Sequence, residues 1–314
     1  MIRVWVESLD RKIKLYYDTE EEMVMDTLHA LMKGPLPSLF FCIGNPVVGN
    51  PTQYMMEEAF LDMDFPGQYI TCEVESDQLQ TALEGLKALH VAGGNVTAPF
   101  KQRVFPYLDS FTESARLSNA VNCITLQSDG TYQGDNTDGK GFLQSLKEQV
   151  SNLRERRVVL FGAGGAASAI AVELVLCEVQ EVILVNRTRE KAEALAQRLR
   201  GVTKTTVSTQ AWEGTYQIEE DGLVVVQATS VGLFDEKRCI DVAFSQGLQD
   251  VIACDVVFNP TDTAFLKRAR EVGATTLDGL GMLVNQGVLG LQNWTGMVPD
   301  ALVMKTALEK AFKL

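Results

Sequence analysis

Short hydrophobic runs alternate along the chain with longer segments in which hydrophobic residues recur at helical spacing. Uninterrupted runs of this length, bounded by turn residues, predict strands that are buried on both faces of a parallel sheet. The runs lie at residues 39–43, 158–161, 182–185, 223–228 and 251–255. Helices are predicted at residues 52–63, 77–90, 141–150, 167–177, 263–272, 282–294 and 300–313. Strands that alternate with helices in this way indicate an α/β protein.

Between residues 38 and 140 the predicted strands do not all follow a strand–helix–strand order. Further strands are predicted at residues 68–74, 93–97, 120–126 and 131–133. Ser128, Asp129 and Gly130 separate the last two, and a turn of this composition predicts a hairpin. Ser76 or Asp77 is the expected cap of the helix at residues 77–90. We therefore expect a sheet of mixed strand direction in this region.

The first 37 residues are predicted to form a separate attachment. Hydrophobic and polar residues alternate at 2–6 and 13–17 as in two short strands, and residues 20–33 have helical spacing. Gly34-Pro35-Leu36-Pro37 then interrupts the pattern like a linker. We predict an N-terminal extension, residues 1–37, to which the sequence assigns no chemistry.

Charge narrows the class of protein. The 314 residues include 41 acidic and 28 basic residues, which give a net charge of −13. An acidic balance argues against a nucleic-acid partner and fits a small-molecule enzyme. The N-terminus is too charged for a secretory signal, and no hydrophobic stretch is long enough to cross a bilayer. We expect a cytoplasmic protein with no nucleic-acid and no membrane partner.

Cysteine and histidine limit the chemistry that is available. The six cysteines are scattered without a C-x-x-C pair, which indicates buried reduced thiols rather than disulfides or metal ligands. His29 and His90 each lie in a predicted helix, with no second ligand at metal-binding spacing. We expect structural surface histidines and neither a histidine-based triad nor a metal site. Acid–base chemistry must then come from Lys, Asp, Glu or Tyr.

A glycine-rich turn joins the strand at 158–161 to the helix at 167–177. The turn reads Gly162, Ala163, Gly164, Gly165, Ala166, Ala167, which is the fingerprint G-x-G-x-x-A. Gly162 permits the tight turn, Gly164 lets the backbone approach a pyrophosphate, and Ala167 keeps the helix close to the sheet. The free N–H groups of the helix then face the anion. Small residues also suit ordinary helix packing, but between two buried strands they predict a dinucleotide site.

The end of the next strand indicates which dinucleotide binds. An NAD site usually carries Asp or Glu there for the ribose 2′-hydroxyl, whereas a nearby arginine accommodates a 2′-phosphate. This chain has Asn186, Arg187 and Thr188 at that point, followed by Lys191. A solvated first helical turn is the alternative explanation, but cations are disfavoured at a helix N-terminus unless an anion lies there. We predict NADP(H) as the cofactor.

Four short stretches at predicted strand ends and turns are rich in carboxamides, hydroxyls and charges. They lie at residues 95–101, 120–122, 136–138 and 285–286. Ligands of α/β proteins bind at such places. Turn chemistry alone explains each stretch singly, since Asn, Asp and Thr are turn formers. It explains less well why a lysine and an aspartate turn occur in one domain.

From about Ser38 to the C-terminus, these motifs resemble those of the shikimate dehydrogenase family. Residues 95–101 are similar to the family's N-V-T-x-P-x-K, and residues 134–139 match its G-D-N-T-D-G. Residues 162–166 and 186–188 resemble its NADP-binding G-A-G-G-A and N-R-T. Later family blocks are resembled at residues 228–232 and 278–286.

The resemblance implies a fold and an activity. The fold is α/β, with an N-terminal mixed-sheet substrate-binding domain, a Rossmann-like NADP-binding domain and a cleft between them. Residues 38–140 with the C-terminal helices of 280–314 would form the first domain, and residues 141–279 the second. The implied activity is the NADP-dependent, reversible reduction of 3-dehydroshikimate to shikimate in aromatic amino acid biosynthesis. A homodimer is the oligomeric form we expect.

The resemblance also assigns roles to individual residues. Lys101 and Asp138 would form the catalytic pair, because an ammonium near the carbonyl stabilises the negative charge that hydride transfer produces. The residues that would bind the substrate's hydroxyls and carboxylate are Asn95, Thr97, Asn122 and Gln286. Two residues of the later blocks, Thr229 and Gly279, would complete the cofactor site.

Three positions depart from the family pattern. Asn50 and Thr52 stand where the family has Ser-x-Ser for the substrate carboxylate, and Phe258 stands where a tyrosine is common. We expect all three to contact the substrate. A quinate- or aminoshikimate-type dehydrogenase is therefore an alternative, since Thr52 resembles quinate-using members. A non-catalytic NADP or metabolite sensor is another, although Lys101 and Asp138 are both retained.

Overall fold

The computed structural model describes residues 2–8, 11–17 and 36–313, and the chain divides into two compact units, 1–37 and 38–314. In the first unit, strands β1 (Ile2–Ser8) and β2 (Arg11–Tyr17) pair in antiparallel register, with Ile2 opposite Tyr17. These are the two strands predicted from the alternating pattern. The helix predicted at residues 20–33 lies outside the described residues.

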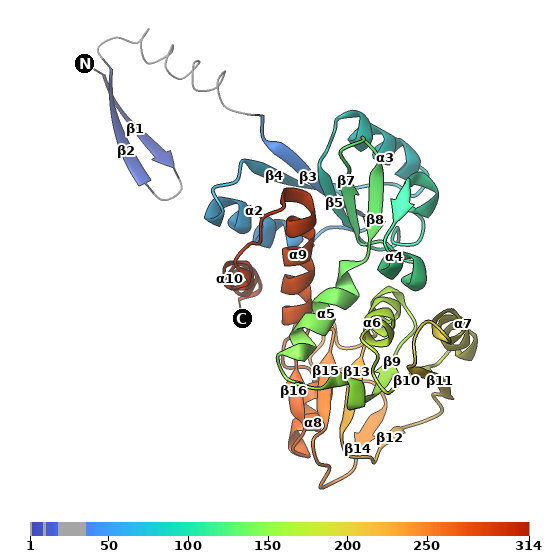
Figure 1. Ribbon diagram of the computed structural model, residues 1–314. Helices are drawn as coiled ribbons and strands as arrows, with labels where there is room; N and C mark the ends of the chain where they lie inside the picture. The colour runs from blue at the N-terminus through green and yellow to red at the C-terminus, as the bar shows by residue number, and fades with distance from the viewer. Residues whose placement is uncertain (1, 9–10, 18–35, 314) are drawn as a thin grey trace. The chain divides into compact units, whose positions relative to one another are not determined.

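The first sheet of the second unit is mixed, as predicted, with the strand order β4-β3-β5-β7-β8-β6 (Figure 1). Its strands are β3 (Ser38–Gly44), β4 (Gly67–Glu73), β5 (Gly93–Val96), β6 (Ser110–Phe111), β7 (Cys123–Leu126) and β8 (Tyr132–Asp135). β3 is parallel to β4 and β5, and β6 is parallel to β8. β7 runs antiparallel to β5 and β8, which confirms the predicted hairpin.

Helices cover both faces of this sheet. They are α2 (Thr52–Asp62), α3 (Leu79–Ala88), α9 (Leu280–Thr295) and α10 (Ala301–Phe312). Because side chains alternate along a strand, neighbouring residues of β3 enter different cores. Phe40 packs with α2, α9 and α10, whereas Phe41 packs with Leu79 and Leu83 of α3. The C-terminal helices thus complete the core of the N-terminal sheet.

The second sheet is wholly parallel, with the order β11-β10-β9-β13-β15-β16. Its strands are β9 (Arg157–Phe161), β10 (Glu181–Asn186), β11 (Thr206–Ala211), β13 (Leu223–Gln227), β15 (Ile252–Asp255) and β16 (Thr275–Leu277). Numbered within the sheet, this is the order 3-2-1-4-5-6 of a Rossmann fold. Its helices are α6 (Gly165–Leu176), α7 (Arg189–Leu199) and α8 (Ala264–Glu271), and β12 (Tyr216–Ile218) pairs separately with β14 (Val242–Phe244).

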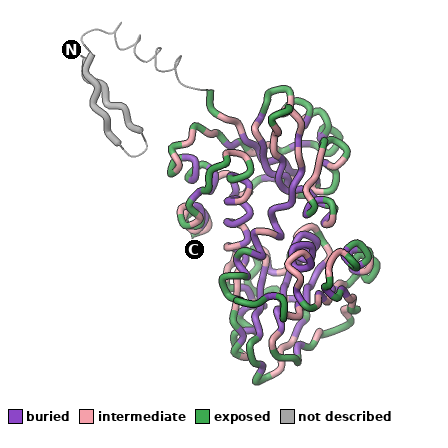
Figure 2. Tube along the Cα trace, viewed as in Figure 1, coloured by how far each residue is buried: buried purple, intermediate pink, exposed green. Residues whose placement is uncertain are grey.

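Helix α5 (Thr137–Lys147) packs against both α6 and α9. Two of its glycines permit this closeness. A Cβ at Gly139 would lie 2.1 Å from the carbonyl oxygen of Ala169 in α6, and a Cβ at Gly141 would lie 2.6 Å from the backbone nitrogen of Gln286 in α9. Figure 2 shows that buried residues follow the strands of both sheets and continue into the helices between them. Helix α5 therefore connects α6 of the second sheet to α9, which packs on the first sheet.

Several predicted boundaries need correction. Helix α5 begins at Thr137 rather than at 141, because the Asn136 side chain accepts a hydrogen bond from the Asp138 amide and caps the helix. Helix α3 begins at Leu79, and neither Ser76 nor Asp77 caps it. The short helix α4 (Glu113–Ser118), capped by Thr112, was not predicted, because six residues are too few to show a hydrophobic period.

The remaining sequence expectations concern single residues. Cys42, Cys123 and Cys254 are buried, the other three cysteines are half-buried, and all six are free. His90 is exposed, as expected, but it lies in a turn with φ 54° rather than within a helix. His29 lies outside the described residues. In the part of the chain that the structure describes, no helix is both long and hydrophobic enough to span a membrane.

Candidate active site

A cavity of about 430 Å³ is lined by residues from both sheets and from the helices between them. Lys101 follows β5, and its Nζ lies 2.6 Å from Oδ2 of Asp138 in the first turn of α5. The two side chains are 25% and 11% exposed, so the ammonium can reach the cavity while its partner is largely covered. Among the described residues, these are the charged side chains that line the cavity.

The Asp138 carboxylate is held on both oxygens. Oδ2 meets the lysine, and Oδ1 accepts a hydrogen bond of 2.7 Å from Nδ2 of Asn122. Asn122 is fixed in turn, because its Oδ1 accepts from the Thr137 amide at 2.7 Å. Carboxylates with an ionic partner and a second donor keep one geometry. The Lys101–Asp138 pair is therefore positioned by the turn from β8 into α5.

Gln286 reaches the same cavity from α9. Its Nε2 donates to the carbonyl of Leu283 at 2.9 Å, and its Oε1 lies 3.5 Å from Nδ2 of Asn122. The close approach of α9 at Gly141 brings this amide beside Asn122. The two carboxamides therefore lie side by side, 164 residues apart in the chain.

Asn95 and Thr97 lie at the end of β5. Oδ1 of Asn95 accepts a 2.6 Å hydrogen bond from the Tyr69 hydroxyl, and Nδ2 donates to the Asn122 carbonyl at 3.2 Å. Burial raises the pKa of Tyr69 well above its usual value, so this hydroxyl stays protonated and can donate. Asn95 is thus engaged with protein on both sides, whereas Thr97 is half-buried at the cavity wall.

Asn50 lines the cavity, but its amide is used within the protein. Oδ1 accepts from the Thr52 amide at 3.0 Å, and Nδ2 lies 2.8 Å from Sγ of Cys42. Burial raises the pKa of the Cys42 thiol to about 12, so the sulfur is neutral. Asn50 therefore shapes the loop before α2, and Thr52 is the side chain there whose hydroxyl remains for a ligand.

Phe258 also lines the cavity, within a cluster of aromatic rings. Its ring stacks on Phe312 of α10 at a centroid distance of 5.5 Å, and it meets the edge of Phe234 at 6.4 Å. Asp255 supports this segment, because its Oδ1 accepts from the Val257 amide at 2.9 Å. This wall presents a hydrophobic surface and no hydroxyl donor at position 258.

The glycine-rich turn has the geometry that a dinucleotide needs. Gly162 has φ +116°, and a Cβ there would lie 2.8 Å from the carbonyl oxygen of Ala228. Gly164 is the N-cap of α6, has no side chain to accept from the first amides of the helix, and would place a Cβ in open space. The first amides of α6 are thus accessible, which fits a pyrophosphate.

The predicted 2′-phosphate residues follow β10. Asn186 donates from Nδ2 to the Thr188 carbonyl at 2.8 Å, which holds the turn. Arg187 and Lys191 are exposed, and within residues 36–313 no carboxylate pairs with either. An anion at this helix N-terminus would offset their charge.

The predicted catalytic and substrate residues lie together in the cavity, whereas most of the predicted cofactor residues do not. All nine predicted catalytic and substrate-contacting residues line the cavity, together with two of the predicted cofactor residues, Ala166 and Gly279. The other predicted cofactor residues lie outside that lining: Gly162, Ala163, Gly164, Gly165, Asn186, Arg187, Thr188, Lys191 and Thr229. Hydrophobic lining residues that the sequence analysis did not assign to a site are Cys42, Val48, Leu233, Phe234 and Met282, among others.

Comparison with known families covers most of the second unit. Residues 42–124 match the shikimate dehydrogenase substrate binding domain, and residues 144–265 match shikimate / quinate 5-dehydrogenase. Residues 279–309 match the shikimate 5′-dehydrogenase C-terminal domain.

Individual relatives extend the comparison. The NADP(+) shikimate dehydrogenase of Desulforamulus reducens is 39% identical over 273 residues, which cover 85% of this chain and 93% of that one. A solved shikimate dehydrogenase in complex with NADP+ is 33% identical, with a TM-score of 0.81, and covers 89% of this chain and 99% of that one. The ligand-free 5-ketofructose reductase of Gluconobacter sp. strain CHM43 is 41% identical, with a TM-score of 0.83, and covers 89% and 100%. The chain belongs to the shikimate dehydrogenase family.

Proposed function

We propose that the protein is an NADP-dependent dehydrogenase that interconverts 3-dehydroshikimate and shikimate, a step of aromatic amino acid biosynthesis. The observation that carries this proposal is the Lys101–Asp138 pair at 2.6 Å, placed in a cavity beside the dinucleotide helix. Relatives in the family are named NADP(+) shikimate dehydrogenases, and one is solved with NADP(H) and shikimate.

The catalytic pair stabilises the charge that develops on the substrate. When bound, the nicotinamide supplies a hydride to the ring carbonyl, whose oxygen becomes negative. Lys101 lies within reach of a ligand in the cavity, so its ammonium can bond that oxygen and deliver a proton to it. Asp138 holds the ammonium, and Asn122 holds Asp138. In the oxidative direction the same lysine accepts the proton.

The other cavity residues orient the substrate. Thr97 and Gln286 line the cavity with a hydroxyl and a carboxamide for the ring hydroxyls. Asn122 is also assigned to the substrate, although its amide is held by Thr137 and Asp138, and Asn95 donates to its carbonyl. A site built from such groups rejects substrates that lack the matching hydroxyls. Thr52 is the donor we assign to the substrate carboxylate, with Asn50 shaping its loop and Phe258 covering the ring.

The cofactor would bind along the second sheet. The residues that we assign to it are Gly162, Ala163, Gly164, Gly165, Ala166, Asn186, Arg187, Thr188, Lys191, Thr229 and Gly279. The open N-terminus of α6 supports the pyrophosphate position, and the exposed cations after β10 support a 2′-phosphate. Residues 38–140 with 280–314 would form the substrate-binding domain and residues 141–279 the NADP-binding domain, with 1–37 as an extension. A cytoplasmic homodimer completes the proposal, and light scattering in solution tests the assembly.

A second candidate is the reduction of a neutral polyhydroxy ketone. The wall that would meet a carboxylate offers an occupied amide at Asn50 and a ring without a hydroxyl at Phe258. The relative named 5-ketofructose reductase is 41% identical to this chain. A neutral ketose would need the catalytic pair and the carboxamides but no carboxylate donor.

One substrate panel separates these functions. We expect the purified full chain to oxidise NADPH faster with 3-dehydroshikimate than with 5-ketofructose. With 3-dehydroshikimate as the substrate, NADPH should be oxidised faster than NADH. Quinate and aminoshikimate would be tested in the oxidative direction beside shikimate. Faster turnover of 5-ketofructose supports the second candidate, and faster turnover of quinate or aminoshikimate supports a related dehydrogenase. Cofactor binding without turnover of any of them would indicate a sensor.

A further inference from the structure

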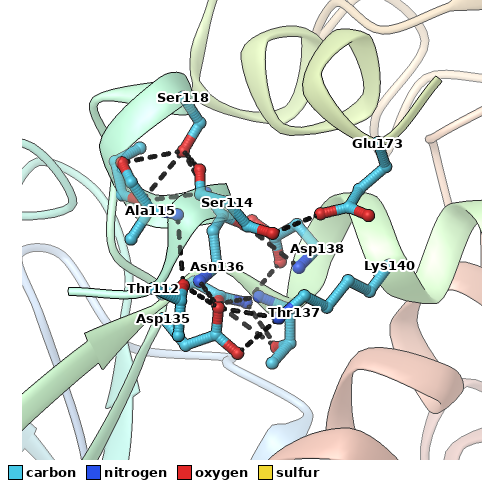
Figure 3. Close-up of polar contacts among 12 residues, drawn as sticks. Thr112, Ser114, Ala115, Ser118, Asp135, Asn136, Thr137, Asp138, Lys140 and Glu173 are labelled. Atoms are coloured by element: carbon cyan, nitrogen blue, oxygen red, sulfur yellow. Dashed lines mark hydrogen bonds and ion pairs between the residues drawn. The ribbon is translucent and has the colours of Figure 1, made fainter. Parts of the chain in front are cut away.

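Glu173 is a buried charge that catalysis does not use. It is the charged residue of α6, whose other residues are small or hydrophobic apart from Ser168, and it is 8% exposed. A carboxylate in such a place costs free energy unless it has donors. Its Oε1 accepts a 2.5 Å hydrogen bond from Oγ of Ser114, which is 6% exposed in α4 (Figure 3). The contact joins the cofactor-binding half of the unit to the substrate-binding half.

The stem of the same side chain lies against the catalytic helix. A Cβ at Gly139 would stand 2.8 Å from Cγ of Glu173. Gly139 is the residue after Asp138, so the first turn of α5 rests directly on α6. Substitution at Glu173 therefore affects two neighbours, Ser114 through the carboxylate and the first turn of α5 through the stem.

Helix α4 is bound to the catalytic turn by two further contacts. Thr112, its cap, donates to Oδ1 of Asp135 at 2.5 Å. Asn136 donates from Nδ2 to Oγ of Ser118 at 3.2 Å, and its Oδ1 accepts from the Asp138 amide at 3.1 Å (Figure 3). A continuous path of contacts thus runs from α6 through α4 to the backbone of Asp138.

Other charged side chains lie around the contact between Glu173 and Ser114. Lys140 pairs with Asp135 at 2.7 Å, and both lie near Glu173, as does Lys147 more distantly. Burial raises the pKa of Glu173, while the Ser114 hydrogen bond and the two lysines oppose that rise. The carboxylate is thus placed for its contact with Ser114 rather than for an ion pair of its own.

We propose that Glu173 is a positioning residue that couples occupancy of the dinucleotide turn to the position of Asp138, through Ser114 and Gly139. The proposal rests on the proposed function in one respect, namely that NADP(H) binds at the N-terminus of α6 and Asp138 works with Lys101. Helix α6 is the physical link, because it carries the turn at one end and Glu173 in its third turn. A rigid element with contacts at both ends can transmit a shift between two sites.

Hydrogen exchange with and without NADP+ tests the coupling. In the wild type we expect NADP+ to slow exchange at residues 162–168, and also at residues 112–119 and 136–141. In Glu173→Ala and Ser114→Ala, protection at residues 162–168 should persist, and protection at residues 112–119 and 136–141 should disappear. Glu173→Gln keeps an acceptor for Ser114 and should restore the protection at residues 112–119 and 136–141. Ser208→Ala, which removes a 3.0 Å hydrogen bond to Glu181 elsewhere in the same domain, is the matched control.

Three outcomes would overturn the proposal. The first is a wild type in which NADP+ protects residues 162–168 alone. The second is protection of residues 112–119 that survives Ser114→Ala, and the third is a Glu173→Gln variant that behaves like Glu173→Ala. Ser114→Ala decides the matter should Glu173→Ala fail to fold. Turnover of shikimate plays no part in these measurements, so a wrong substrate assignment would leave their result unchanged.

As a kinetic measurement, kcat should fall in Glu173→Ala with whichever ketone the enzyme reduces. Misplacement of a reacting group by about 1 Å can cost about 100-fold in rate, and we expect a fall no larger than that. KM for NADPH should change little, since the turn itself is intact. A rise in that KM with no change in kcat would show that Glu173 serves only the packing of α6.

Discussion

Two groups of residues in the cavity lining, which we name the first and the second side, use their polar groups differently. On the first side, Lys101, Asp138 and Asn122 bond to one another beside the start of α5. On the second side, Asn50 turns its amide to Cys42, and Phe258 stacks on Phe312. The first side has the groups that we propose for proton transfer to a carbonyl. The second side is where this chain departs from the family pattern, and we expect it to influence which carbonyl compound fits.

The aspartates on the two sides, Asp138 and Asp255, also differ in their partners. Asp138 has a cationic partner at 2.6 Å. Asp255, which supports the Phe258 wall, has neutral donors, namely Gln227, Thr263 and the Val257 amide. Burial without a cation raises the pKa of Asp255 to about 6. One side is therefore stabilised by charge, and the other by hydrogen bonds around a carboxyl group that protonates readily.

The largest expected effect comes from removing the cation on the catalytic side. Lys101→Ala should lower kcat by about two to four orders of magnitude, because general acid–base groups typically contribute that much. Steady-state kinetics would measure it, with NADPH affinity little changed. Lys87→Ala, which breaks an exposed 2.8 Å pair with Asp109, is the control. A Lys101 variant with near-normal kcat would remove this residue from the mechanism.

Asp255 gives the next effect, on stability rather than on rate. Its pKa rises from 3.8 to about 6 on folding, so the folded state holds the proton more tightly. The stabilisation is complete below about pH 4 and is lost as pH rises through about 6, a change of about 3 kcal/mol for a shift of this size. Asp255→Asn should remove that pH dependence.

Urea unfolding of both proteins between about pH 4 and pH 7 measures the difference. The wild-type free energy of unfolding should fall relative to that of the variant across this window. Parallel curves for the two proteins would show that Asp255 does not protonate in the window. Asp250→Asn is a useful control, because its exposed carboxyl has a pKa lowered by Arg156.

The cofactor prediction concerns a third region and is of intermediate size. Arg187→Ala should raise KM for NADPH by about 10- to 100-fold, as hydrogen bonds to charged groups are worth about 1.5–3 kcal/mol. KM for NADH should stay nearly constant, because NADH lacks the 2′-phosphate. Equal weakening of both cofactors would mean that Arg187 stabilises the turn instead.

The sequence predicted the first side of the cavity more completely than the second. Lys101, Asn122, Asp138 and Gln286 stand out because polar residues at strand ends are few and chemically specific. The role of Asn50 was missed, since its amide is used by Cys42, eight residues away across a loop that no local pattern describes. Phe234 was missed for another reason, since a phenylalanine is ordinarily expected in the core. In the fold it lies at the cavity, has φ 58°, and is 68% exposed.

Helix α5 and helix α6 also differ from what their local sequence predicts. The start of α5 was predicted four residues late, at Gly141, because the polar run that ends at Gly139 looks like a turn. Both glycines are instead required where α5 crosses α6 and α9. Glu173 was not noticed at all, since a single Glu in an alanine-rich helix ordinarily faces solvent. Tertiary contacts override local preference at these positions, and these positions surround Asp138.

The smallest expected effect tests the substrate wall itself. The double variant Asn50→Ser, Phe258→Tyr restores the hydroxyl groups of the family pattern to a wall that now has none at either position. A hydrogen bond to a charged group is worth about 1.5 kcal/mol or more, so KM for shikimate should fall about tenfold with kcat little changed. Serine can still accept from the Thr52 amide as Asn50 does, so the loop before α2 should keep its form. Phe312→Tyr, which adds a hydroxyl to the same aromatic cluster but outside the cavity lining, controls for a general effect of polarity. If the double variant binds shikimate more weakly while reduction of 5-ketofructose is also impaired, the present wall is adapted to a ligand without a carboxylate, and the catalytic side alone is what this chain shares with its shikimate-binding relatives.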